Sequence, residues 1–173
     1  DRVAPASTAK LLTALTVLKY CGVDEILTAG EEISLISEGA STASLKLGTR
    51  GSVKVFLGAM LIPSGNDAAY SLANFAGHKI LGDENVSVAE AVGAFVEAMN
   101  AYAAELELED SNFENPDGDQ SENQYTTARD MVRIAKACLE NETIMEIVKA
   151  NSFRALFENA DVTYKNSNEM VKP

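Results

Sequence analysis

Histidine, tryptophan and cysteine are scarce in this sequence of 173 residues. It contains one histidine, His78, no tryptophan, and two cysteines, Cys21 and Cys138, which are far apart. A zinc site built on several histidines is therefore excluded, and so is a pair of catalytic histidines. The cysteines form neither a disulfide framework nor a zinc knuckle, although two buried thiols and one disulfide are both compatible with them. We expect no metal and no cofactor, and we interpret His78 as a surface residue or one that faces a helix dipole.

Positive charge is also scarce. Lys and Arg number 14 against 26 Asp and Glu, which gives a formal net charge of −12. This excess of acid argues against nucleic acid, and against an anionic membrane surface, as the main partner. No apolar run approaches the roughly 18 residues of a transmembrane helix. The sequence has no signal peptide and begins at Asp1 without an initiator Met, so we expect a piece of a longer protein.

What the sequence does contain is a series of amphipathic helices in a chain of one-domain length. Three helices are predicted at residues 7–21, 66–81 and 142–149. Three more begin at polar caps: one runs from Ser52 to a break at Pro63, one from the Ser87–Glu90 capping box to Leu106, and one from caps at Thr127 and Asp130 to Cys138. Residues 23–51 predict short extended pieces and turns, residues 107–125 an acidic loop, and residues 153–164 a hairpin.

One pair of residues could supply a nucleophile and its base without histidine. In Ser7-Thr8-Ala9-Lys10 the serine stands at a helix start and the lysine three residues later, so both side chains lie on one face. Burial favours a neutral lysine, which could take the proton of the Ser7 hydroxyl. The alternative is that Ser7 is only a helix cap and Lys10 is solvated, and the tetrapeptide alone is weak evidence against it.

A second candidate is Ser64-Gly65-Asn66, a predicted turn between two helices that follows an apolar run. Its hydroxyl and carboxamide, two residues apart, could both face a cleft, although a simple turn explains them equally well. Two other segments share the pattern, Ser121-Glu122-Asn123 and Tyr164-Lys165-Asn166. The context favours Ser64, because Ser121 lies in an acidic loop and Tyr164 lies near the end of the chain.

Taken together and in this order, the segments resemble the penicillin-binding D-alanyl-D-alanine carboxypeptidases, the low-molecular-weight serine D,D-peptidases of bacteria. The matching stretches are PASTAKLLTALTVL at 5–18, SLKLGTRGSVKVFLGAMLIPSGNDAAYSLA at 44–73, NFENPDGD at 112–119, YTTARDMVRIAKACL at 125–139 and YKNSNEM at 164–170. The S-x-x-K tetrapeptide is part of the known signature of penicillin-binding proteins.

The resemblance implies a concrete mechanism. Ser7 would attack the carbonyl between the two terminal D-alanines of a peptidoglycan stem peptide, with Lys10 as general base and Ser64 as proton relay. Asn66 would hydrogen-bond the peptide amide of the substrate, and also Lys10. Water would then hydrolyse the acyl-enzyme, and β-lactams would acylate the same serine. Such enzymes act outside the cytoplasmic membrane, and any membrane tether would lie beyond Pro173.

The sequence departs from the family in several places. The K-T-G motif is missing, and the one K-x-G, Lys46-Leu47-Gly48, precedes Ser64 and is interpreted as a turn. We therefore expect residues 1–173 to be the mainly α, helical subdomain of the β-lactamase/D,D-peptidase-like α+β fold. Most of the β-sheet would be missing from this single, incomplete catalytic domain, which alone would turn over substrate poorly. Gln124 and Asp119 stand where relatives often carry His and Leu, which bears on the packing of the loop.

Four other functions remain as alternatives. A class A β-lactamase is disfavoured because no Glu in the chain has an Asn four residues later. An endopeptidase or a transpeptidase would use the same residues on a different substrate or acceptor. A non-catalytic helical binding module that has kept the scaffold is disfavoured by the joint presence of Ser7, Lys10, Ser64 and Asn66.

Overall fold

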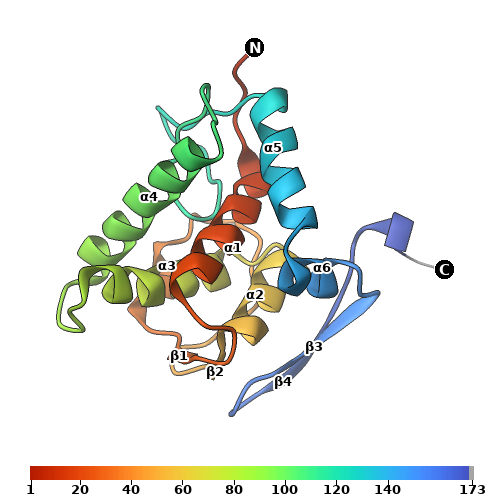
Figure 1. Cartoon of the computed structure of the whole chain (residues 1–173). Coiled ribbons are helices and arrows are strands. Elements are labelled where there is room, and N and C mark those ends of the chain that lie inside the picture. The colour runs from red at the N-terminus through yellow and green to blue at the C-terminus, as the bar shows by residue number, and fades with distance from the viewer. Residues whose placement is uncertain (172–173) are drawn as a thin grey trace.

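The computed structural model describes residues 1–171, and Figure 1 shows that they are mainly helical. The helices are α1 (Ala9–Tyr20), α2 (Val53–Leu61), α3 (Asn66–Leu81), α4 (Val88–Glu105), α5 (Ala128–Leu139) and α6 (Glu142–Val148). Three-residue to five-residue 3-10 turns lie at Ala6–Thr8, Glu31–Leu35 and Glu169–Val171. Strands β1 (Ile26–Thr28) and β2 (Arg50–Ser52) pair antiparallel, as do β3 (Ser152–Leu156) and β4 (Asp161–Lys165). The predicted mainly α class is confirmed, and so is the hairpin near the C-terminus.

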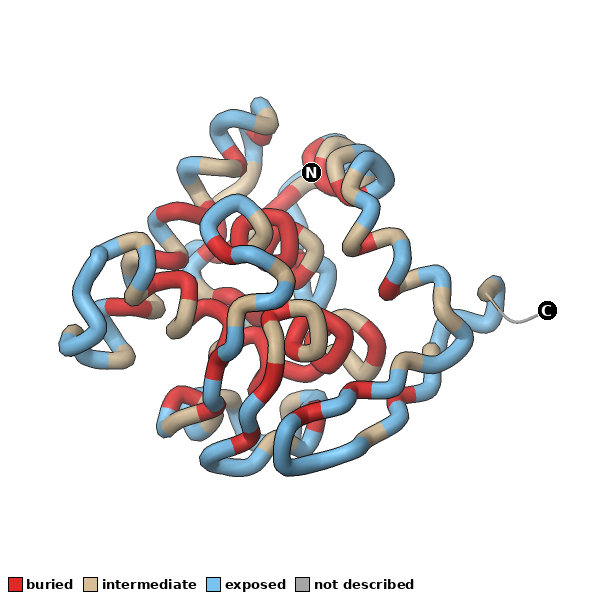
Figure 2. Tube along the Cα trace, turned by 60° about the horizontal axis from the view of Figure 1, so that its bottom comes forward, coloured by how far each residue is buried: buried red, intermediate tan, exposed pale blue. Residues whose placement is uncertain are grey.

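Helix α1 lies in the middle of the molecule. It contacts α2, α3, α4 and α5, and in Figure 1 it lies between α4 and α5. Its apolar residues include Leu12 and Val17, which have no exposed surface, and the same holds for Phe56 of α2 and Phe95 of α4. Figure 2 shows the buried positions concentrated in this central region. The surrounding helices therefore fix α1 firmly in place, together with the residues just ahead of it.

Polar caps define where the surrounding helices begin. The Ser52 hydroxyl accepts a hydrogen bond from the Val55 amide at the start of α2. Ser87 and Glu90 form the predicted capping box at the start of α4. Such caps satisfy amide groups that have no partner inside the helix, which is why these helix starts were predictable from the sequence.

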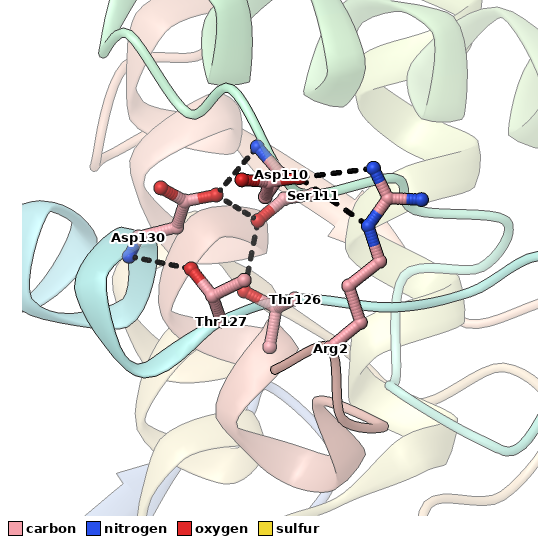
Figure 3. Close-up of polar contacts among 6 residues, drawn as sticks. All are labelled: Arg2, Asp110, Ser111, Thr126, Thr127 and Asp130. Atoms are coloured by element: carbon pink, nitrogen blue, oxygen red, sulfur yellow. Dashed lines mark hydrogen bonds and ion pairs between the residues drawn. The ribbon is translucent and has the colours of Figure 1, made fainter.

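The prediction that Asp130 helps to cap α5 is wrong. The Thr127 hydroxyl does accept from the Asp130 amide at 3.2 Å. The Asp130 carboxylate, however, points away from the helix start and accepts from the Asp110 amide at 3.0 Å and from the Ser111 hydroxyl at 2.7 Å (Figure 3). A buried carboxylate needs donors, and those at the start of the acidic loop were in reach.

The same cluster fastens the acidic loop at both ends. The Ser111 hydroxyl also lies 2.9 Å from that of Thr126, and Arg2 forms an ion pair with Asp110 at 2.9 Å (Figure 3). The backbone of Val3 pairs with that of Thr126. The N-terminal segment, the loop and the start of α5 are thereby joined just ahead of the turn that contains Ser7.

Two smaller expectations are settled by the fold. Cys21 and Cys138 are free and buried, and burial raises the pKa of each thiol to about 11, so they are inert thiols. Lys46-Leu47-Gly48 forms the expected turn, in which the Thr49 amide donates to the Lys46 carbonyl at 2.9 Å. Among residues 1–171, no helix is both long enough and apolar enough to cross a membrane.

Candidate active site

Three of the four predicted residues meet around one hydroxyl. Ser7 lies in the 3-10 turn Ala6–Thr8, one turn ahead of α1, where we had expected the helix itself to begin. The Lys10 Nζ donates a hydrogen bond to the Ser7 Oγ at 3.1 Å, and the Ser64 Oγ donates to the same atom at 2.9 Å. Ser64 comes from the turn between α2 and α3, so residues 57 positions apart are brought together.

Lys10 is buried, with 1% of its surface exposed. Its second hydrogen bond goes to the backbone carbonyl of Asp117, at 2.6 Å. Burial lowers the pKa of Lys10 to about 8, and the negative charges of Asp117, Asp119 and Asp67 oppose that fall. An amine with a pKa near 8 is about one tenth neutral at pH 7, and the neutral form can accept a proton from a neighbouring hydroxyl.

Ser64 reaches Ser7 because its backbone is unusual. Its φ of 61° lies in the left-handed region, which a residue with a side chain rarely adopts. The following residue must be glycine, since a Cβ on Gly65 would stand 2.6 Å from the Ala59 carbonyl oxygen. Strain of this kind persists where the surrounding structure holds it, and it is common at functional sites.

The acidic loop closes over the other side of Lys10. Gly118, with φ of 83°, packs so tightly on the Ser7 turn that a Cβ would lie 1.8 Å from the Ala6 carbonyl oxygen. Gln124, one of the two departures from the family pattern, is buried and holds this loop. Its carboxamide accepts from the Glu114 amide at 2.9 Å and donates to the Asn115 Oδ1 at 3.0 Å. The loop packing is therefore intact without the histidine that relatives often carry.

Asn66 lines the cleft as expected, but its expected hydrogen bond to Lys10 is not formed. It begins α3, lines the same cleft, and its backbone amide donates to the Ser41 carbonyl at 2.9 Å. Among residues 1–171, the Lys10 Nζ bonds Ser7 and Asp117 and makes no hydrogen bond to the Asn66 side chain.

Ser7 opens into a cleft of about 390 Å³. Its walls come from the N-terminal segment, residues 37–41, the start of α3 and residues 117–120. Just after the second of these segments, the Ala43 and Leu45 amides donate to the Asp67 carboxylate at 2.8 and 2.9 Å. Ser7 and Asn66 line the cleft, and Lys10 is buried next to Ser7.

The remaining candidates lie elsewhere. Tyr164 donates to the Ala43 carbonyl at 2.8 Å from within the C-terminal hairpin, and Ser121 bonds Glu114 within the acidic loop. His78 lines a larger hollow of about 710 Å³ at the far end of α3, which includes none of the residues around Ser7. Among residues 1–171, no group of three or more His, Cys, Asp or Glu side chains is placed to hold a metal ion.

Two residues near the site have no role in the expectations from the sequence. Asp117 is buried and its carbonyl bonds Lys10, and Asp67 is buried and bonds the Ala43 and Leu45 amides. The Pro-Asp-Gly turn signalled that the chain bends at Asp117. Nothing in the local sequence indicated that this bend would pack against a helix more than 100 positions away.

Comparison with known proteins gives a consistent result. The family model described as D-alanyl-D-alanine carboxypeptidase matches residues 1–173. D-alanyl-D-alanine carboxypeptidase DacF of Bacillus subtilis is 33% identical over 180 residues, which cover 99% of this chain and 42% of that protein. D-alanyl-D-alanine carboxypeptidase of Streptomyces strain K15 is 30% identical, over 89% of this chain and 52% of that protein. The chain thus spans about half the length of these curated relatives.

Solved structures agree with the sequence matches. The Streptomyces K15 DD-transpeptidase superimposes with a TM-score of 0.87 at 30% identity, over 98% of this chain and 66% of that one. Penicillin binding protein 6B from Escherichia coli superimposes with a TM-score of 0.81 at 26% identity, over 99% of this chain and 52% of that one. The helical arrangement in Figure 1 is therefore similar to a large part of each.

Proposed function

Because the chain belongs to the D-alanyl-D-alanine carboxypeptidase family, we propose that the protein containing it removes the terminal D-alanine from peptidoglycan stem peptides through an acyl-enzyme on Ser7. One observation carries the proposal. The Ser7 Oγ lies within hydrogen-bond distance of both the Lys10 Nζ and the Ser64 Oγ. That is the arrangement a serine nucleophile needs when its base is an amine.

Lys10 is the base in this proposal. Once its ammonium has lost a proton, the lone pair of Nζ faces the Ser7 hydroxyl across the 3.1 Å contact and takes its proton. The Ser7 Oγ then attacks the carbonyl carbon between the two D-alanines. The resulting tetrahedral oxyanion receives one hydrogen bond from the Ser7 backbone amide.

Ser64 carries the proton onward. Its Oγ contacts that of Ser7 and can pass the proton from Lys10 to the nitrogen of the leaving D-alanine, so that the C–N bond breaks and a neutral amine departs. A water molecule next loses a proton to the same base and attacks the ester, which frees Ser7. Asn66 lines the cleft and is assigned to the peptide amide of the substrate.

The proposal also covers partners and location. A β-lactam presents a strained amide in the place of the D-alanyl-D-alanine bond and would acylate Ser7. The substrate lies outside the cytoplasmic membrane, so the protein acts there. We treat residues 1–173 as the helical part of a catalytic domain, because the sequence has no K-T-G motif and spans about half the length of its curated relatives.

A second candidate activity is transpeptidation. One protein similar to this chain is named a DD-transpeptidase, and in such a reaction an amine would replace water in the second step. The residues around Ser7 serve either acceptor.

The test is release of D-alanine from a peptide ending in D-alanyl-D-alanine, measured on the protein that contains these residues. We expect Ser7→Ala to abolish release and Ser64→Ala to slow it at least tenfold. Ser121→Ala is the matched control, because it changes the other Ser-x-Asn segment and should leave the rate unchanged. Full release by Ser7→Ala would refute the proposal.

A further inference from the structure

The backbone of Asp117 is hydrogen-bonded directly to Lys10. Its carbonyl oxygen accepts the 2.6 Å hydrogen bond from the Lys10 Nζ, and the neighbouring Gly118 is in contact with the Ala6 carbonyl. The ends of the loop are fastened by the cluster around Asp130 and Ser111 (Figure 3). Residue 117 therefore has little freedom to move away from the lysine.

The carboxyl group of Asp117 is buried, with 1% of the residue exposed, and it is only half satisfied. Its Oδ1 accepts from the Asp119 amide at 3.1 Å. Its Oδ2 has no hydrogen-bond partner among residues 1–171. An orphaned oxygen of this kind costs stability, so its retention beside the reacting groups calls for an explanation.

The other acidic groups that face Lys10 are better occupied. Asp67, at the start of α3, accepts three backbone amides, from Ala43, Leu45 and Ala68. Asp119 is partly exposed and accepts from Ser37 and from the Gln120 amide. Among these carboxylates, Asp117 has the largest electrostatic effect on Lys10, and Lys10 in turn lowers the pKa of Asp117, which burial raises. Tyr70 of α3 also faces Asp117 and Asp119, and its pKa of about 12 keeps it neutral.

We propose that Asp117 is a positioning residue for Lys10: its carbonyl aims the Nζ at Ser7, and its buried carboxylate sets the pH at which Lys10 releases its proton. The proposal rests on the role of Lys10 as the base in the proposed function. An ammonium beside a carboxylate holds its proton more firmly, so the negative charge of Asp117 works against the effect of burial. The two opposing effects keep the pKa of Lys10 near the pH at which it must both accept and return a proton.

The first test is Asp117→Asn, which keeps the backbone carbonyl and nearly the same side-chain volume but removes the charge. We expect the titration of Lys10, followed by NMR of the chain with ¹³C-labelled lysine, to move about one pH unit or more to lower pH. The rate at which penicillin labels Ser7 falls as the pH is lowered, and in Asp117→Asn this fall should occur about one pH unit lower than in the unchanged protein. Asp119→Asn is the matched control on the same loop, and solvent screening should limit its effect to a few tenths of a pH unit.

A second variant keeps the proposal testable if Asp117→Asn does not fold. Because the coupling between two groups is reciprocal, Lys10→Met should move the titration of the Asp117 carboxyl to higher pH by a similar amount. The proposal would be overturned if Lys10 in Asp117→Asn, or Asp117 in Lys10→Met, titrated within about 0.2 pH unit of its value in the unchanged chain. NMR reads Lys10 directly, so this result is independent of whether Ser7 is acylated, which is the matter that tests the proposed function.

Discussion

The buried amine of Lys10 should make the free energy of unfolding depend on pH. Lys10 is 1% exposed and has a pKa of about 8 in place of 10.5. Its amine therefore binds a proton more weakly in the folded chain than in the unfolded chain. Below about pH 8 both states hold the proton, and the buried ammonium costs stability. Between about pH 8 and 10.5 only the unfolded chain still holds it, so stability rises with pH through this window.

The size of the effect follows from those two pKa values. Since one pKa unit corresponds to about 1.4 kcal/mol, the contribution of Lys10 to the free energy of unfolding should rise by about 2–3 kcal/mol between pH 7 and pH 10. Lys10→Met is the matching variant, because methionine is also unbranched and cannot titrate. The hydrogen bonds to Ser7 and Asp117 that it removes are lost at every pH, so they shift the whole curve without changing its slope.

The assay is urea unfolding of both proteins followed by circular dichroism at four values of pH from 7 to 10. The free energy of unfolding of the wild-type chain minus that of Lys10→Met should become more positive by about 2–3 kcal/mol over this range. Titrating groups that do not interact with Lys10, including both cysteines, cancel in the difference. A difference that is constant within about 0.5 kcal/mol, or that becomes more negative, would refute the account of Lys10 as a lysine with a lowered pKa.

Two further predictions concern the loop that covers Lys10. Gly118→Ala should lower the free energy of unfolding by about 2 kcal/mol or more and slow acylation of Ser7, because its Cβ meets the Ala6 carbonyl. Gly48→Ala, also at φ of 83° but with nothing within 4 Å, should cost only about 1 kcal/mol in the same urea measurement, and equal losses would disprove the contact. Gln124→Ala should cost about 2 kcal/mol or more through unsatisfied backbone groups, whereas Gln120→Ala, on the exposed part of the loop, should stay within about 0.5 kcal/mol. A neutral Gln124→Ala would show that the loop does not depend on this side chain.

Local patterns predicted the parts of the fold that depend on nearby residues. Ser52 and the Ser87–Glu90 pair marked helix starts because their hydrogen bonds span only three residues. The contact of Lys10 with Ser7 followed from helical spacing in the same way. The direction of the Asp130 carboxylate and the burial of Asp117 depend on packing between segments far apart in the chain, which no local pattern records.

In the site, too, local patterns predicted some features, and others depend on packing between distant segments. Ser64 was preferred over Ser121 and Tyr164 from its apolar context, and the structure brings Ser64 alone of the three to the Ser7 hydroxyl. The wall formed by residues 37–41 had no sequence signal, since its position depends on a contact with α3, in which the Asn66 amide donates to the Ser41 carbonyl. Helical spacing paired Ser7 with Lys10, family resemblance supplied the expected role of Ser64, and the approach of Ser64 to Ser7 came only from the fold.

The central claim, that Ser7 is the nucleophile, is tested most directly by finding where a β-lactam becomes attached. The protein that contains these residues would be treated with fluorescent penicillin, digested, and its labelled peptide identified by mass spectrometry. The account predicts a single label, on the Ser7 hydroxyl, and none on the Ser7→Ala variant. A label on Ser64 or elsewhere, or labelling that persists in Ser7→Ala, would contradict it.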